Sequence, residues 1–129
     1  MPKRRLVPLL PVVALVCSMT WPAVAQAPQG DAAFLLTIFL RHDQTKTLDE
    51  INQHLDKTGF REEFPPHGVE VVSWYVMMGI GQVVTLRVPP SRLRDVNLAI
   101  ERNAWGAFRT EFYPTYDFKP IYEASRKAR

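Results

Sequence analysis

Apolar and polar residues alternate along short stretches of the chain, which is the pattern of β-strands. Four stretches show this alternation: residues 33–41, 69–78, 82–88 and 108–113. The first has apolar residues on both faces, which is typical of a central strand. The second and third are joined by Gly79-Ile80-Gly81, a short glycine-containing connection that predicts a hairpin. Beyond Pro114, residues 116–118 are expected to extend the last strand along an edge of the sheet.

Two other stretches repeat apolar residues at helical spacing: about residues 47–58 and about residues 92–104. The first begins with Thr47 and Glu50 in the spacing of a capping box, and Gly59 is expected to end it. Ser91 is expected to cap the first turn of the second helix. Residues 61–68 contain two adjacent prolines and are expected to form a loop.

These elements run in the order strand, helix, strand, strand, helix, strand. This is the ferredoxin-like βαββαβ order of an α+β protein, in which an antiparallel sheet carries both helices on one face. Alternation within the strands turns one set of side chains toward the helices: Phe34, Leu36, Ile38, Trp74, Val76, Met78 and Leu86. These residues are expected to contribute most of the core from the sheet.

No predicted element covers the other face of the sheet. Its residues are expected to be Leu35, Thr37, Phe39, Ser73, Met77, Val83, Thr85, Arg87, Arg109, Glu111 and Tyr113. An uncovered face that mixes large apolar residues with polar ones is typical of an interface. Two sheets packed face to face would cover it, so we predict a homodimer with an isologous contact.

The first 25 residues have the composition of a secretory signal peptide. A basic start at Lys3, Arg4 and Arg5 is followed by an apolar stretch and by small residues before a cleavage site after Ala25. Prolines interrupt the apolar stretch, and it is shorter than the roughly 20 residues that cross a bilayer, so no retained membrane anchor is expected. We expect a periplasmic or secreted protein with three further parts: a flexible lead-in (26–32), the folded domain (33–120) and a charged tail that frays (121–129).

The formal charge of +3 comes entirely from the three basic residues of this leader. The rest of the chain is neutral and has no basic stripe, so nucleic acid is not an expected partner. Cys17 is the only cysteine and lies in the leader. A mature chain without it has no disulfide, no cysteine nucleophile and no thiolate metal site.

His42 and Asp43 lie where the first strand is expected to end. A histidine beside a carboxylate can transfer protons, so His42 is a candidate catalytic residue. The alternative is a polar strand exit in which Asp43 caps a turn. His54 is expected on the flank of the first helix, half covered, and His67 in an exposed loop. The histidines match no metal-binding spacing, so neither a metal nor another cofactor is expected.

A second group of candidates lies on the uncovered face and would point into the interior of the dimer: Tyr75, Arg87, Arg109, Glu111 and Tyr113. An arginine there can hold the carboxylate of a ligand, with Glu111 or a tyrosine as the proton acceptor. The alternative is structural, with Arg87 or Arg109 paired to Glu111 inside the dimer. On the helix side, Trp74 is a candidate for lining an apolar ligand pocket, although aromatic residues in such positions usually form core.

The element order over residues 33–120 resembles that of the dimeric α+β barrel superfamily. Within it the chain is most similar to the GYD-type domains. These have a glycine, two variable residues, an acid and two valines where this chain has Gly79-Ile80-Gly81-Gln82-Val83-Val84, with Gln82 in place of the acid. Arg109-Thr110-Glu111 in the last strand adds to the likeness. A looser resemblance connects the chain to muconolactone isomerase-like proteins, which share the tryptophan of the hairpin. Both resemblances imply a dimeric barrel.

We therefore expect an exported dimeric α+β barrel that binds a small, largely apolar organic molecule or serves as a structural module. The alternative is a cofactor-independent isomerase or monooxygenase that acts on a small organic acid or lactone, with His42 or Glu111 as base. A filled layer between helices and sheet, together with a packed dimer interior, would count against the enzyme. The expected partners are a second copy of the chain and a small apolar or acidic ligand.

Overall fold

The computed structural model describes residues 32–128. The predicted signal peptide and nearly all of the lead-in lie outside these residues. The described part contains four strands, four α-helices and one 3-10 turn: β1 (Phe34–His42), α1 (Leu48–Thr58), α2 (Phe60–Glu63), β2 (Glu70–Met77), β3 (Gly81–Val88), the turn Pro90–Arg92, α3 (Leu93–Asn103), β4 (Phe108–Thr115) and α4 (Lys119–Lys127).

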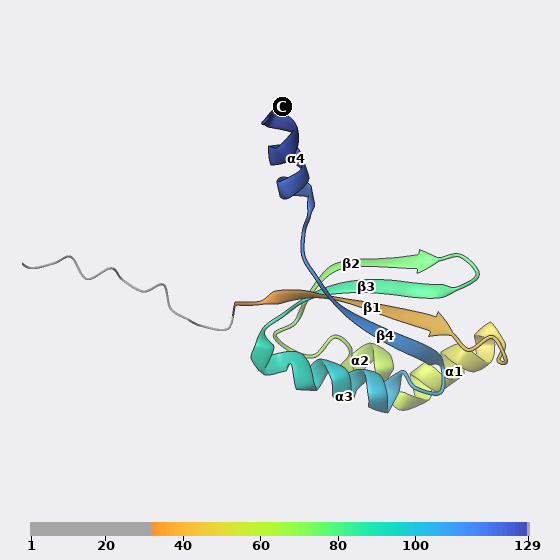
Figure 1. Cartoon of the computed structure of the whole chain (residues 1–129). Helices are drawn as coiled ribbons and strands as arrows, with labels where there is room; N and C mark the ends of the chain where they lie inside the picture. The colour runs from red at the N-terminus through yellow and green to blue at the C-terminus, as the bar shows by residue number, and fades with distance from the viewer. Residues whose placement is uncertain (1–31, 129) are drawn as a thin grey trace, which may run out of the picture.

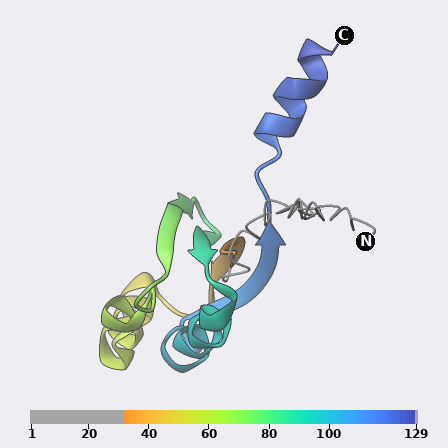
Figure 2. The same cartoon turned by 90° about the vertical axis from the view of Figure 1, so that its left-hand side faces the viewer.

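The four strands form one antiparallel sheet in the order β2-β3-β1-β4. β1 is central, as its apolar residues on both faces predicted. α1, α2 and α3 lie on one face of this sheet, and α4 extends from the end of β4 toward the other side (Figures 1 and 2). The chain is therefore an α+β protein, and its arrangement is compatible with the ferredoxin-like fold.

The core lies between the sheet and the helices α1–α3. Its buried side chains include ten from the two central strands, α1 and α3: Leu36, Ile38, Leu40, Ile51, Leu55, Val84, Leu86, Val88, Val96 and Ile100. Each is at most 4% exposed, so the layer between helices and sheet is filled. This confirms the predicted orientation of Leu36, Ile38 and Leu86. Burial of these apolar side chains is the main favourable term in folding.

The outer strand β2 contributes less to the core than its pattern predicted. Val76 is 71% exposed and Met78 is 93% exposed, so their assignment to the core was wrong. Trp74 lies at the margin of the core, where its ring packs edge-on against Phe60 and Phe64. The two misassigned residues lie toward the hairpin end of an outer strand, and a position on the helix side of the sheet buries a residue only where a helix lies over it.

The hairpin turns one residue earlier than predicted, because Met77 pairs with Gly81. Met78, Gly79 and Ile80 therefore form the connection, and the Ile80 amide donates to the Met77 carbonyl over 3.0 Å. Gly81 begins β3 where this strand approaches β1 closely. A Cβ at this position would lie 2.1 Å from the carbonyl oxygen of Leu40, so only glycine fits here.

The two ends of α1 form as predicted. The Thr47 hydroxyl accepts a hydrogen bond from the Glu50 amide, and the Glu50 carboxylate accepts one from the Thr47 amide, which completes the capping box. Gly59 ends the helix in a left-handed conformation with φ of 73°. The predicted loop that follows was partly wrong, because residues 60–63 form the short helix α2 and place Phe60 in the core.

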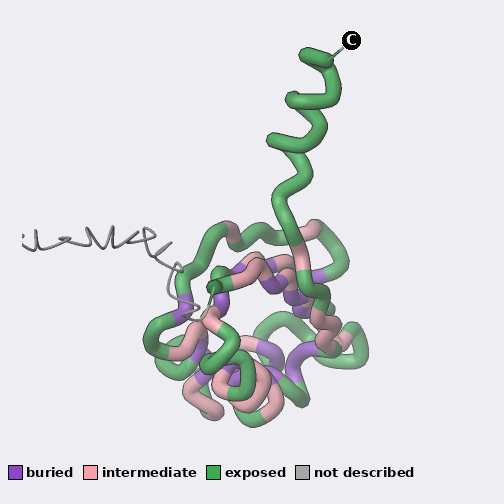
Figure 3. The backbone as a smooth tube through the Cα atoms, turned by 60° about the vertical axis from the view of Figure 1, so that its left-hand side comes forward, coloured by how far each residue is buried: buried purple, intermediate pink, exposed green. Residues whose placement is uncertain are grey.

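The start of α3 and the C-terminal region differ from the predictions. Ser91 does not cap α3, because it lies within the 3-10 turn that leads directly into the helix. β4 continues through Pro114 to Thr115, which is allowed because β4 is an outer strand whose proline needs no partner. Residues 116–118 form no strand, and the expected fraying tail is instead the helix α4, exposed along its whole length (Figure 3).

Candidate functional site

The face of the sheet turned away from α1–α3 carries the candidate site, and we refer to it as the open face. It consists of four rows of side chains that run across the strands in the order β2, β3, β1, β4: Met77, Gly81, Arg41 and Arg109; Tyr75, Val83, Phe39 and Glu111; Ser73, Thr85, Thr37 and Tyr113; and Glu70, Arg87, Leu35 and Thr115. All residues predicted for this face lie on it, because their alternation continues through β1, β3 and β4.

The middle of the open face combines hydroxyl groups with aromatic rings. The Thr37 hydroxyl lies 3.2 Å from that of Thr85, and it accepts a hydrogen bond from Thr115 over 2.7 Å. The Phe39 and Tyr113 rings pack edge to face, with their centroids 5.7 Å apart. Phe39 is partly exposed, whereas 49% of Tyr113 and 67% of Tyr75 are exposed to solvent. The face therefore leaves a substantial aromatic surface uncovered.

An ion pair and a tyrosine lie toward one end of this face. The Arg41 Nε donates to Glu111 Oε1 over 2.7 Å, and the Tyr113 hydroxyl donates to the other carboxylate oxygen, also over 2.7 Å. The hydrogen bonds from Tyr113 and Arg41 hold the pKa of the Glu111 carboxyl below its ordinary value. The same bond raises the pKa of the Tyr113 hydroxyl, because deprotonation would place a second negative charge beside Glu111.

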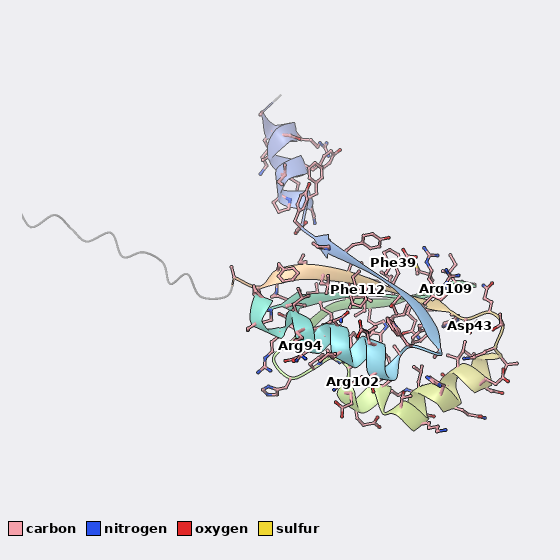
Figure 4. The ribbon with its side chains drawn as sticks, turned by 60° about the horizontal axis from the view of Figure 1, so that its bottom comes forward. Phe39, Asp43, Arg94, Arg102, Arg109 and Phe112 are labelled. Atoms are coloured by element: carbon pink, nitrogen blue, oxygen red, sulfur yellow. The ribbon has the colours of Figure 1, made fainter. Side chains whose placement is uncertain are left out.

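Arg109 lies directly opposite Arg41 in the pairing of β1 with β4. Like charges in opposite positions of two strands destabilise a sheet unless an anion neutralises them. Glu111 neutralises Arg41, but no ion pair connects Arg109 to a carboxylate of residues 32–128. Arg109 is exposed and lies near the turn that carries Asp43 (Figure 4). The end of the open face therefore presents a positive charge to solvent.

A shallow depression of about 460 Å³ begins at this end of the sheet. Its lining consists of Arg41, His42, Asp43, Gln44, Thr45, Ile80 and Arg109. The side chain of Asp43 accepts hydrogen bonds from the amide and the hydroxyl of Thr45, which lower the pKa of the Asp43 carboxyl. Asp43 therefore caps a turn, which confirms the structural alternative for this residue.

His42 lies apart from Glu111, the other candidate catalytic residue. Its ring stacks on that of Phe108, with centroids 5.6 Å apart, on the helix side of the sheet. The other two histidines are placed as predicted: His54 is partly buried and its ring nitrogen lies 2.8 Å from the Trp105 carbonyl oxygen, and His67 is exposed. The structure therefore does not assemble His42 and Glu111 into one catalytic group.

The structure separates the predicted ligand-binding residues into four places. Arg109 and Tyr113 lie near Glu111 at one side of the open face, whereas Tyr75 lies on the outer strand β2. Arg87 lies at the opposite end of the sheet, where its Nε is 3.2 Å from Glu70 Oε2. Among residues 32–128, Glu111 pairs with Arg41 and Arg87 pairs with Glu70, so the alternative pairing of Arg87 or Arg109 with Glu111 inside a dimer stays a prediction. Trp74 lies on the helix side, and its indole donates to Gln82 over 2.7 Å.

Sequence reasoning missed the role of Arg41. The alternation of β1 places Arg41 on the open face, but only the pairing of β1 with β4 places it against Arg109 and beside Glu111. Pairing between distant strands leaves no local signal in the sequence. The two arginines at matching ends of predicted neighbouring strands were the available clue.

Three further searches gave negative results. Residues 32–128 contain no group of three or more His, Cys, Asp and Glu side chains placed to hold a metal ion. No helix within this same range has the length and apolar character that crossing a bilayer requires. Comparison with known proteins found no matching family model, no matching curated protein and no matching solved structure.

Proposed function

We propose that the protein is an exported homodimer that binds a small organic acid between the open faces of its two chains. Two open faces packed together would form an α+β barrel, as the resemblance to the GYD-type domains implies. The observation that carries the proposal is the pair of arginines, Arg41 and Arg109, on an otherwise largely neutral face where one carboxylate, Glu111, contacts Arg41. A bound carboxylate would neutralise the second arginine.

The composition of the open face supports both parts of this proposal. Phe39, Val83 and Leu35 are partly exposed, and Tyr75 and Tyr113 are largely exposed, so contact with a second copy would remove much apolar area from water. The same rings offer an apolar surface to the body of a ligand. Arg109 supplies the planar donor group that binds a carboxylate through two parallel hydrogen bonds.

Binding is better supported than catalysis. The alternative, a cofactor-independent isomerase or monooxygenase, needs a group that accepts a proton from the substrate. Glu111 is a weak proton acceptor, because hydrogen bonds from Tyr113 and Arg41 lower the pKa of its carboxyl. Tyr113 stays protonated near neutral pH, because its pKa is raised. The filled layer between helices and sheet also favours a binding role.

The test combines oligomeric state with ligand binding. Light scattering on the purified protein should give twice the mass of one chain, and native mass spectrometry should show any small molecule that remains bound. Benzoate and cyclohexanecarboxylate serve as probes in isothermal titration, with benzamide as the uncharged control. We expect the carboxylates to bind and the amide to bind at least tenfold more weakly, since a charged hydrogen-bond partner contributes about 1.5–3 kcal/mol.

A matched pair of variants locates the site. Arg109→Gln should weaken carboxylate binding by about 10- to 100-fold. Arg87→Gln removes the same charge at the opposite end of the open face and should leave the affinity nearly unchanged. A monomeric protein, or equal affinity for benzoate and benzamide, would contradict the proposal.

A further inference from the structure

α4, together with the residue before it, carries an apolar stripe that residues 32–128 leave uncovered. Phe118, Ile121 and Tyr122 are spaced three and four residues apart, so they share one side of the helix. Each is more than half exposed, and no residue of α4 is buried. Lys119, Glu123 and Lys127 lie outside this stripe, whereas the Arg126 guanidinium lies over the Tyr122 ring, 5.9 Å from its centroid. α4 is therefore strongly amphipathic, and the described part of the chain provides no core contact for its apolar side.

A helix of nine residues needs such a partner. Isolated helices shorter than about 12–15 residues are marginal in water, and protein helices gain most of their stability from packing of an apolar side. Residues 116–118 join α4 to β4, and three residues span at most about 10 Å. α4 lies on the side of the sheet away from α1–α3 (Figures 1 and 2). The core below the sheet is therefore out of its reach.

A second copy can cover this stripe if the two open faces pack together. A twofold axis parallel to the strands places β4 of one chain beside β2 of the other, so that the two outer strands, each unpaired on one side, lie together. The end of β4 is level with the start of β2, because Thr115 pairs with Leu35, Leu35 with Arg87, and Arg87 with Glu70. α4 then reaches the start of the partner's β2.

The start of β2 has the surface that such a helix requires. Val71 and Val72 are exposed at this outer edge, where the pairing with β3 is interrupted by a bulge. Val71 lies opposite Leu86, on the helix side of the sheet, so the arm would reach it around the edge of the strand. The charges are complementary as well. Residues 60–72, which lead into β2 and form its start, carry three glutamates and one arginine, whereas α4 carries three basic residues and one glutamate.

We propose that α4 is an arm that packs Phe118, Ile121 and Tyr122 against Val71 and Val72 of a second copy of the chain. This inference rests on the proposed dimer and specifies one of its contacts. It makes the arm part of the interface between the chains, and it explains why an exposed apolar stripe and an exposed pair of valines lie at the same end of the sheet.

Cysteine cross-linking tests the contact directly. In the full chain with Cys17→Ser, one preparation carries Tyr122→Cys and a second, with a different tag, carries Val72→Cys. After mixing and mild oxidation, we expect a disulfide-linked heterodimer on a non-reducing gel. The control replaces Val72→Cys by Met78→Cys, which is more exposed but lies six residues further along the chain, just beyond the end of β2 and about 20 Å away. Its cross-linking should be at least several-fold lower.

The possible results distinguish a failure of the proposed arm contact from a failure of the proposed dimer. Equal cross-linking at positions 72 and 78, or none, in a protein that light scattering shows to be dimeric would overturn the arm and leave the proposed function standing. A monomeric mass would overturn both. A variant with Phe118→Ser, Ile121→Ser and Tyr122→Ser should raise the dimer Kd by roughly tenfold or more. Binding of the unmodified chain, but not of this variant, to vesicles of phosphatidylglycerol and phosphatidylcholine would overturn the arm in favour of a lipid surface.

Discussion

The two faces of the sheet come from the same strands but have opposite relations to the rest of the chain. In β1, Leu36, Ile38 and Leu40 are at most 2% exposed, whereas the intervening Leu35 and Phe39 are only partly buried. The helix side is apolar and filled, and the open face mixes rings, hydroxyls and charges. Adjacent residues of one strand thus have different surroundings, because the first set forms the core and the second is not covered by residues 32–128.

The largest difference should appear between neighbours in β1. Ile38→Ala should lower the free energy of unfolding by about 2–5 kcal/mol, because Ile38 is fully buried and the change leaves a cavity. Phe39→Ala should destabilise the protein mainly through the proposed dimer, so its effect should shrink when the protein is diluted below the Kd of that dimer. Urea unfolding at two protein concentrations measures both. A loss of unfolding free energy for Phe39→Ala that is as large as for Ile38→Ala, and independent of protein concentration, would contradict this distinction between the two faces of β1.

A second pair of variants shows where the covered face ends. Trp74→Ala should cost about 2 kcal/mol, less than a fully buried aromatic residue, because Trp74 is 37% exposed at the margin of the core. Val76→Ala, two residues further along the same side of β2, should change the stability by no more than about 0.5 kcal/mol. Thermal and urea unfolding provide the measurement. A large loss for Val76→Ala would mean that something covers the hairpin.

Replacing Arg41 and replacing Arg109 should have different effects on the melting temperature. Arg41→Gln should lower the melting temperature, because it removes the partner of Glu111. Arg109→Gln should leave the melting temperature of the ligand-free protein unchanged or slightly higher, because it removes a like charge opposite Arg41. Differential scanning calorimetry at low ionic strength compares them, since salt screens both effects. A lower melting temperature for Arg109→Gln would give this residue a structural role.

The smallest effect concerns how the free energy of unfolding changes at acidic pH. The pKa of Glu111 is lower in the folded chain than its ordinary value of 4.5. The stability that this shift provides is therefore complete above the ordinary value and is lost as the pH falls through the folded-state pKa. Unfolding free energies between pH 6 and pH 3 should fall less steeply for Glu111→Gln than for the unchanged protein. Tyr113→Phe should lie between them, because Tyr113 makes the largest contribution to the shift.

Much of the fold could be predicted from sequence because its signals are local. Alternation assigned β1, β3 and β4 to their faces, and Thr47, Glu50 and Gly59 marked the ends of α1. The errors arose where burial depends on neighbours that alternation does not reveal, as for Val76 and Met78 on the outer strand. α4 was missed because its apolar stripe has only three members within a highly charged segment.

The candidate site was less predictable than the fold. The sequence identified Arg109, Glu111 and Tyr113 as neighbours on one face, since they alternate within one strand. It could not identify Arg41 as the partner of Glu111, because that contact joins residues 70 positions apart and depends on the pairing of β1 with β4. The local pattern therefore identifies which charged residues lie on a face of the sheet, but strand pairing determines which of them contact each other.

The central position of β1 has a consequence for how the domain unfolds. β1 pairs with β3 and with β4, and the residues paired with β4 lie about as far away along the chain as the domain permits. Dividing the chain at any one point between two strands therefore separates strands that pair with each other in the sheet. Fraying of β4 exposes the edge of β1, whose inner side holds the core together. We expect cooperative, all-or-none unfolding of the sheet and slow formation of its long-range contacts.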